Sequence, residues 1–298
     1  GGGVWAGQVN LSHIHCQASL NGHIEVFDEP LNKYRVIGLR IWNDNLNLTN
    51  ARFDADLRLN CVDVLADDEH KAKGFGDLDL RSTTIGGLMV LMGARITKDL
   101  NFDFCEIRDY VNAYHSLDWD FEPRLALHVG NEISMSGANM GSVELRGVRV
   151  GQRVRALTGT FGRMLISTGV MPYGKDIALM PVVSQIGALE FSSVTFTGEL
   201  HLTGIRITSE ERSHGGFRRT QSNRGLKITG CSIGGDLLFF QEELKVNLER
   251  RWSPTLENRP SWVNPENQDI ERSSSDESTA RGVTNEPLRT SVMQARTW

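Results

Sequence analysis

An 11-residue spacing of apolar residues recurs along most of this chain. In its clearest copy, Leu189, Phe191, Val194 and Phe196 stand at positions 0, 2, 5 and 7, and the next unit begins at Leu200. Thirteen such units begin at Val9, Leu46, Leu57, Leu78, Met89, Leu100, Ile133, Val143, Val154, Met164, Leu189, Leu200 and Leu226. The template positions that are not apolar are Thr83, Gly159 and Gly169.

This spacing is typical of very short β-strands joined by turns. An apolar pair at i and i+2 lies on one face of a strand, whereas an amphipathic helix needs apolar residues at i+3 and i+4 together. One unit cannot bury its apolar pairs alone, so the units must stack on one another. The sequence therefore predicts an all-β fold in which two units, about 22 residues, make one turn of a stack with six or seven turns.

The residues between the apolar pairs favour tight turns. Glycine is frequent, with 30 Gly against 8 Pro in 298 residues. An acidic residue often precedes the first apolar residue of a unit, as in Asp56-Leu57, Asp77-Leu78 and Asp99-Leu100. Gly adopts backbone conformations that other residues avoid, and Asp can accept hydrogen bonds from neighbouring backbone N–H groups. These residues are therefore assigned to corners between strands and not to a phosphate-binding loop.

The segments Ala51-Arg52-Phe53, Ala55-Asp56-Leu57-Arg58-Leu59 and Gly93-Ala94-Arg95-Ile96 resemble the pentapeptide-repeat family. The resemblance covers roughly residues 9–240 and implies a right-handed, quadrilateral β-helix, a solenoid with loop insertions and a C-terminal tail. The pattern of that family advances in steps of five residues, whereas the units here mostly alternate steps of five and six. We therefore expect a wider corner at every second side.

The repeat predicts one solenoid over residues 1–241, followed by a different kind of sequence. Three insertions interrupt the repeat, near residues 21–45, 108–132 and 208–224. In stacked-repeat proteins, insertions leave from one face and often carry binding residues. Residues 242–251 have the pattern of a short amphipathic helix suited to cap the last turn. The polar residues 252–298 predict an extended or disordered tail.

The formal net charge of −5 conceals two halves of opposite sign. Residues 44–133 carry a net charge of −8, and residues 134–235 carry +6. Two interpretations stay open: head-to-tail association of the acidic end with the basic end, or binding of an anionic partner to an arginine-rich strip. The strip consists of outward-pointing arginines at Arg146, Arg149, Arg153, Arg155 and Arg163.

Aromatic residues outside the repeat are the other candidates for binding a partner. Tyr114 and Trp119 lie in the second insertion, and Trp252 and Trp262 lie in the tail. No catalytic residue, cofactor site or metal site is assigned. We therefore expect a non-enzymatic scaffold that binds a protein partner or itself, and we do not expect nucleic acid as a partner.

Two other functions stay open. Some members of the resembled family imitate DNA and bind topoisomerases, which requires acidic residues spread regularly along the solenoid. A β-helix enzyme acting on carbohydrate needs two carboxylates in a groove, and Asp118 and Asp120 beside Trp119 are the candidates.

Three histidines near the N-terminus are weighed as metal ligands. His13 and His15 would share the outward face of a strand, with His23 nearby. A structural zinc site needs four ligands in closed geometry, so solvated histidines are the preferred interpretation.

The cysteines are interpreted as structural. Cys16, Cys105 and Cys231 occupy apolar template positions and are expected to be buried thiols, while Cys61 falls between such positions. Their wide spacing argues against a disulfide framework or a zinc ribbon. The sequence also contains no apolar run long enough for a membrane-spanning helix and no visible signal pattern. A cytoplasmic location is therefore expected.

Overall fold

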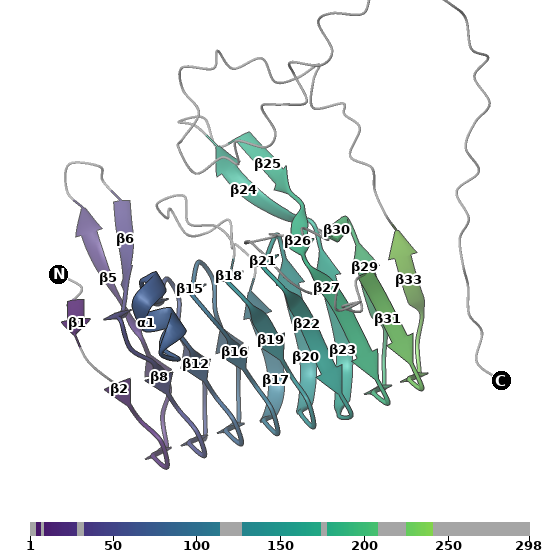
Figure 1. The fold of residues 1–298 in the computed structure, drawn as a ribbon, viewed down its shortest axis with the longest axis horizontal. Coiled ribbons are helices and arrows are strands. Elements are labelled where there is room, and N and C mark those ends of the chain that lie inside the picture. Colours follow the sequence, from purple (N-terminus) through teal and green to yellow (C-terminus); the bar gives the residue numbers. More distant parts are fainter. Residues whose placement is uncertain are drawn as a thin grey trace, which may run out of the picture. The chain divides into compact units, whose positions relative to one another are not determined.

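The structure is a computed structural model that describes residues 4–6, 9–28, 33–113, 127–173, 178–207 and 225–240. Three parallel β-sheets, here called A, B and C, hold most of these residues, and α1 (Asp68–Ala72) is the single α-helix among them. The chain passes through sheets A, B and C in this order repeatedly, and each passage is here called a visit. Neighbouring strands of a sheet therefore come from successive visits (Figure 1). The all-β class predicted from the apolar spacing is therefore confirmed.

Sheets A and B each contain eight strands. The order in sheet A is β1 (Val4–Ala6), β7 (Arg40–Trp42), β11 (Asp63–Leu65), β15 (Arg95–Ile96), β18 (His128–Val129), β21 (Arg149–Val150), β26 (Ser184–Ile186) and β30 (Ile205–Ile207). The order in sheet B is β2 (Val9–Asn10), β8 (Leu46–Asn47), β12 (Leu78–Asp79), β16 (Leu100–Asn101), β19 (Glu132–Ser134), β22 (Arg153–Leu157), β27 (Ala188–Ser192) and β31 (Gly225–Thr229).

Sheet C contains thirteen strands, because most visits of the chain contribute two short strands to it. Its main path runs through β3 (His15–Cys16), β9 (Arg52–Phe53), β13 (Thr84–Ile85), β17 (Glu106–Ala113), β20 (Asn139–Arg146), β23 (Thr160–Ser167), β28 (Thr195–Phe196) and β32 (Ser232–Ile233). The strands beside this path are β4 (Leu20–Asn21), β10 (Leu57–Arg58), β14 (Met89–Val90), β29 (Leu200–Thr203) and β33 (Leu237–Phe240).

The register between neighbouring strands follows the predicted period where nothing intervenes. Leu78 pairs with Leu100, 22 residues later, and Ile133 pairs with Val154, 21 residues later. Two longer steps contain an antiparallel hairpin, formed by β5 (His23–Asp28) with β6 (Lys33–Gly38) and by β24 (Gly169–Tyr173) with β25 (Ala178–Val182). Both hairpins project beyond the three sheets on the same side in Figure 1.

The chain makes more visits than the six or seven turns predicted. Each visit contributes one strand to sheet A and one to sheet B, and these sheets have eight strands each. The missed strands include β4, β33 and the second half of β17, whose core residues are Leu20, Leu237 and Val111. They lie beside interruptions of the repeat, where the spacing to the next unit is lost. Residues 108–113, assigned to an insertion, belong to β17 and pair with β14 and β20.

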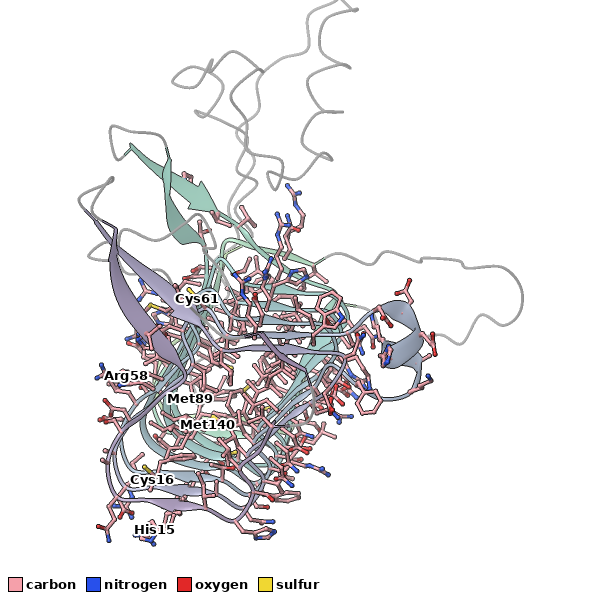
Figure 2. The ribbon with its side chains drawn as sticks, turned by 90° about the vertical axis from the view of Figure 1, so that its left-hand side faces the viewer. His15, Cys16, Arg58, Cys61, Met89 and Met140 are labelled. Atoms are coloured by element: carbon pink, nitrogen blue, oxygen red, sulfur yellow. The ribbon has the colours of Figure 1, made fainter. Side chains whose placement is uncertain are left out.

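The apolar template positions form one continuous core between the sheets. Leu46, Leu57 and Phe53 have no more than 1% of their surface exposed. Thr83, a polar template residue, is fully buried, and its Oγ1 donates a hydrogen bond of 2.7 Å to the carbonyl oxygen of Leu48. Figure 2 shows Met89 in this interior, with Arg58 outside it. The predicted inward positions are therefore correct in these strands.

Two kinds of connection alternate between the strands. The shorter kind is a tight β-turn, in which the N–H of Ala51 donates to the carbonyl oxygen of Leu48 at 3.1 Å. The third residue of this turn, Asn50, has a φ of 57°, and Ser82 has the same φ in the equivalent turn of the next visit. A β-turn with a positive φ at its third residue favours Gly or Asn there. The alternation agrees with the predicted steps of five and six residues.

The longer connections use acidic side chains, but not in the way predicted. The N–H of Asp99 donates to Oδ1 of Asp77 at 3.0 Å, and the N–H of Glu132 donates to Oδ1 of Asp99 at 3.1 Å. Each carboxylate thus accepts from the equivalent residue of the next visit rather than from its own chain neighbours. The expected corner role is confirmed, and the expected local bonding is wrong at these two residues.

One predicted unit is wrong in its second half. Gly169 and Met171 were expected to point into the core, but they lie in β24, which pairs antiparallel with β25. Ser184–Ile186 takes the corresponding place in sheet A. Pro172 explains the difference, because a proline has no N–H to donate within a sheet interior. Residues 114–126 of the second insertion and the segments 208–224, 242–251 and 252–298 lie outside the described residues.

The burial of the cysteines depends on their place in the stack of strands. Cys105 is 1% exposed and Cys61 is 6% exposed, while Cys16 and Cys231 are half-buried because their strands are first and last in sheet C. The Cys105 thiol donates to the carbonyl oxygen of Leu80 at 2.7 Å. Burial raises the pKa of this thiol to about 12.

Candidate functional site

The outer surface of sheet A carries an arginine on every second strand. The four arginines are in register with one another on β7, β15, β21 and β30. We call them, together with the residues at the same register position of the strands between them, the arginine ladder. In strand order its members are Arg40, Asp63, Arg95, His128, Arg149, Gln185 and Arg206.

The alternation of side chains along a strand explains why the ladder faces outwards. Arg95 precedes Ile96, and Arg149 precedes Val150; both of these apolar residues are 2% exposed and belong to the core. Successive side chains of a strand point to opposite faces, so the preceding residue points away from the core. Neighbouring strands are about 4.8 Å apart, so arginines on alternate strands recur at about 9.5 Å.

The ladder position on a strand between two arginine-bearing strands is here called a gap. At the first gap, the carboxylate of Asp63 lies between two guanidinium groups. Asp63 Oδ1 and Oδ2 accept hydrogen bonds of 2.9 Å from Nε and Nη2 of Arg95, respectively. On the other side, Nε of Arg40 lies 3.6 Å from Asp63 Oδ2. The Asp63 side chain is 2% exposed, whereas those of Arg40 and Arg95 are 46% and 38% exposed. Charge-assisted, two-point contacts of this kind are strong and fix geometry.

The next two gaps of the ladder hold neutral side chains. His128 lies between Arg95 and Arg149, and Gln185 lies between Arg149 and Arg206. Partial desolvation and the positive charges of Arg149 and Arg95 lower the pKa of His128, although it is exposed. Within the described ranges, Arg149 and Arg206 form no ion pair with a carboxylate. This part of the ladder therefore presents positive charge to solvent.

Three glycines form a row beside the neutral part of the ladder. Gly130, Gly151 and Gly187 each lie two residues after a ladder residue, directly after the ends of β18, β21 and β26. A Cβ atom on Gly130 would lie 1.9 Å from the carbonyl oxygen of Thr97, and one on Gly151 would lie 2.0 Å from that of Gly130. Side chains are therefore excluded here by the preceding strand, and bare backbone flanks the arginines.

An exposed tryptophan lies in line with this glycine row. Trp42 is 50% exposed and pairs in register with Leu65 at the first strands of the ladder. Its position two residues after Arg40 corresponds to that of the glycines after His128, Arg149 and Gln185. The strip beside the ladder thus begins with Trp42, Leu65 and Thr97 and continues with the glycines.

The arginines proposed from the sequence do not form one strip, so that prediction is wrong. Arg153 and Arg155 lie on sheet B, where their Nε atoms contact the carboxylate of Glu132 at 2.5 and 2.9 Å. Arg146 lies on sheet C and contacts Glu144 at 3.1 Å. The chain passes from sheet to sheet, so the five arginines are distributed over three sheets.

Arg163 also lies on sheet C, where its Nη1 is 3.6 Å from Glu144. Of the five arginines, Arg149 is the one that belongs to the ladder. The four proposed aromatic residues, Tyr114, Trp119, Trp252 and Trp262, lie outside the described residues.

Sequence reasoning missed Arg40, Arg95 and Arg206 as members of the site. These arginines are more than 50 residues apart in the chain, so no local cluster marks them. A usable signal was present for two of them. Arg95 and Arg206 stand between the third and fourth apolar residues of units already recognised, as does Arg149. Comparing that single position in every second unit would have grouped them, because the same position in the other units, such as Arg52, lies on sheet C.

The N-terminal histidines do not share a strand face as expected. His13 lies in a turn with a φ of 59°, and only His15 belongs to β3. Nε2 of His15 lies 2.8 Å from Oδ2 of Asp54, whose pKa is lowered by hydrogen bonds from Arg52 and His15. Within the described part of the chain, no three metal-ligating side chains come together.

Comparison with known proteins finds no family model, no curated protein and no solved structure that matches this chain. In the described ranges, no helix has the length and apolar character needed to cross a bilayer.

Proposed function

We propose that this chain is a non-enzymatic interaction scaffold that binds an anionic protein partner through the arginine ladder. The observation that carries the proposal is the arginine on every second strand of sheet A, with neutral residues in the gaps at His128 and Gln185. The chain as a whole has a net charge of −5, so attraction of an anion depends on a local arrangement of cations.

The proposal includes a fold. We propose that the three sheets are the sides of a right-handed, quadrilateral β-helix similar to that of pentapeptide-repeat proteins, with sheet C forming two sides. Support comes from the repeated A, B, C order of strands and from the register steps of 21 and 22 residues. In such a solenoid, equivalent residues of successive turns stack in columns, which is how one residue per turn builds a ladder.

The use of carboxylates elsewhere supports binding rather than acid–base catalysis. Glu132 is engaged by Arg153 and Arg155, Glu144 by Arg146, and Asp79 by Arg81 at 2.6 Å. These carboxylates are occupied by ion pairs, either with arginines of the neighbouring strand, as at Glu132, or with the arginine two residues later, as at Glu144 and Asp79. The positive charge at Arg149 and Arg206 is not used in this way among the described residues.

Binding to a labelled polyglutamate tests the proposal, with the double variant R149Q/R206Q as the probe. We expect the native chain to bind at low ionic strength and the double variant to lose most of that binding. The matched control is R52Q/R81Q, which removes the same charge from arginines that are 62% and 54% exposed on other surfaces. Equal losses in both double variants would indicate unspecific electrostatics and overturn the proposal.

A further inference from the structure

The distance between the two neutral gaps of the arginine ladder determines which ligand conformation can place a carboxylate in both. We propose that the arginine ladder recognises an acidic peptide segment in the polyproline II conformation, with a carboxylate at every third residue. This inference rests on the proposed function and deepens it, because it names the chemistry and the shape of the partner segment. The site consists of the gaps at His128 and Gln185, with Arg95, Arg149 and Arg206 around them.

The protein supplies its own example of the contact. At the first gap, the Asp63 carboxylate lies between Arg40 and Arg95 and accepts two hydrogen bonds from Arg95. The gaps at His128 and Gln185 have arginine on both sides in the same register but no carboxylate of their own. A ligand carboxylate entering either gap would have an arginine on each neighbouring strand in the register that Arg40 and Arg95 have beside Asp63, although Arg95 is already bound to Asp63.

The distance between the two gaps sets the spacing of the ligand's carboxylates. His128 and Gln185 are two strands apart, which corresponds to about 9.5 Å. A polyproline II helix has three residues per turn and rises about 3.1 Å per residue, so residues i and i+3 lie on one side about 9.3 Å apart. Glutamate or aspartate at every third residue therefore matches the gaps without stretching.

Other extended polyanions match the gaps less well. In a β-strand, residues on one face recur every second residue, at about 6.7 Å. Each strand of duplex DNA carries a phosphate for about every 3.4 Å of helix axis. Both present charge more densely than the gaps recur, so part of their charge would lie at the level of the arginines without entering a gap.

The surface beside the ladder also suits a polyproline II segment. Gly130 and Gly151 carry no side chain there and are not buried, so the ligand chain can approach the backbone closely at these two positions, whereas Gly187 is buried. Trp42, which is 50% exposed, lies at the start of the same strip. Proline-rich segments dock against aromatic side chains and lose little conformational entropy on binding, because their helix is formed in advance.

Three labelled peptides of equal net charge test the inference by fluorescence anisotropy. The first repeats Glu-Pro-Pro, the second has the same composition with glutamate at every second position and the remaining prolines at the ends, and the third repeats Glu-Gly-Gly. We expect the first to bind at least about tenfold more tightly than the second, since misplacing one charge-assisted contact costs that much. The third should also bind more weakly, because it must be ordered on binding.

Two variants locate the contact. R149Q should weaken binding of the Glu-Pro-Pro peptide most, since Arg149 borders both gaps. R81Q removes an exposed arginine from another surface and should leave binding unchanged. Tighter binding of duplex DNA than of the Glu-Pro-Pro peptide, or equal binding of the three peptides, would overturn the inference. If the peptides bind equally but R149Q still weakens them, the proposed function survives; if R149Q has no effect on any anion, both fail.

Discussion

Asp63 and Arg95 form a two-point ion pair between adjacent strands, with both hydrogen bonds at 2.9 Å and the carboxylate almost completely buried. On the other side of Asp63, Nε of Arg40 on the neighbouring strand β7 lies 3.6 Å from the same carboxylate. The pair is asymmetric, because the acid is buried while both arginines reach water. Removing one partner or the other should therefore have different consequences.

R95Q is expected to destabilise the protein more than D63N. R95Q removes two hydrogen bonds of 2.9 Å from a buried carboxylate, while Arg40 stays 3.6 Å away, and removing one partner of a buried ion pair costs about 3 kcal/mol. D63N leaves arginines that water can solvate, so a loss of about 1–2 kcal/mol is expected. Urea unfolding at neutral pH measures both, and R81Q, in an exposed pair, should cost less than about 1 kcal/mol. A larger loss for D63N than for R95Q would contradict this account.

The tight turns predict opposite effects for two substitutions at one position. Ser82 is exposed and has a φ of 57°, a conformation that Gly adopts without strain. S82G is therefore expected to change the free energy of unfolding by less than about 1 kcal/mol, whereas the β-branched S82V should cost about 1–2 kcal/mol. Thermal unfolding of the two variants would distinguish them. Equal melting temperatures would show that the turn does not constrain φ.

The glycine row should tolerate no side chain. A Cβ on Gly151 would lie 2.0 Å from a backbone oxygen of the preceding strand, so G151A must push two strands apart. We expect a loss of about 2–3 kcal/mol, comparable to severe overpacking. G22A is the control, because its Cβ would meet the flexible end of Leu59 at 2.8 Å. If G22A were as costly as G151A in denaturant unfolding, the backbone clash would not be the cause.

The four thiols should react in two classes. Cys105 is buried and the pKa of its thiol is raised to about 12, so little thiolate is present at neutral pH. Cys61 is also buried, whereas Cys16 and Cys231 are half-buried. Labelling with a maleimide followed by mass spectrometry should modify Cys16 and Cys231 first, and the other two after unfolding. Labelling of Cys105 at the rate of Cys16 in the native protein would contradict the described burial.

His128 should make stability fall in weak acid. Its pKa is lowered in the folded state by desolvation and by Arg149 and Arg95, while an unfolded histidine has a pKa near about 6.5. The unfolded chain therefore binds more protons as the pH drops below about 6.5, and the free energy of unfolding decreases until the pH passes the folded value. H128Q should remove this part of the pH dependence.

Urea unfolding over a series of pH values measures the effect of His128. H13Q, which removes an exposed histidine from a turn, controls for the loss of a histidine as such. The same pH dependence in the native chain and in H128Q would show that the neighbouring arginines do not influence His128.

The sequence predicted the buried positions of the strands far better than the contacts between surface side chains. Apolar spacing located the core because burial requires the same kind of residue at every visit, as at Leu78 and Leu100. The hairpin that carries Gly169 was missed, because the apolar spacing continues through it by coincidence and only Pro172 signals the break. The acidic corners were recognised, but their partners on the next strand were not, since stacking decides which N–H group each carboxylate meets.

The ladder could not be seen in the sequence as a cluster. Arg95 and Arg149 share one column because a step that contains the second insertion, from Arg95 to His128, and a regular step, from His128 to Arg149, both return the chain to the same register of sheet A. Arginines that are close in sequence, such as Arg149 and Arg153, end on different sheets. A search for charged runs is therefore the wrong test for such a chain; the appropriate test follows one position of the repeat through every second unit.

The alternation in the ladder also limits how this chain can change its length. Arginine occupies every second strand of sheet A, so the column has an odd and an even set of strands. Loss or duplication of a single visit would exchange the two sets beyond that point and place like neighbours side by side, such as His128 next to Gln185 if β21 were lost. Changes that add or remove strands in pairs keep the alternation, so parity, more than total length, governs which rearrangements preserve this surface.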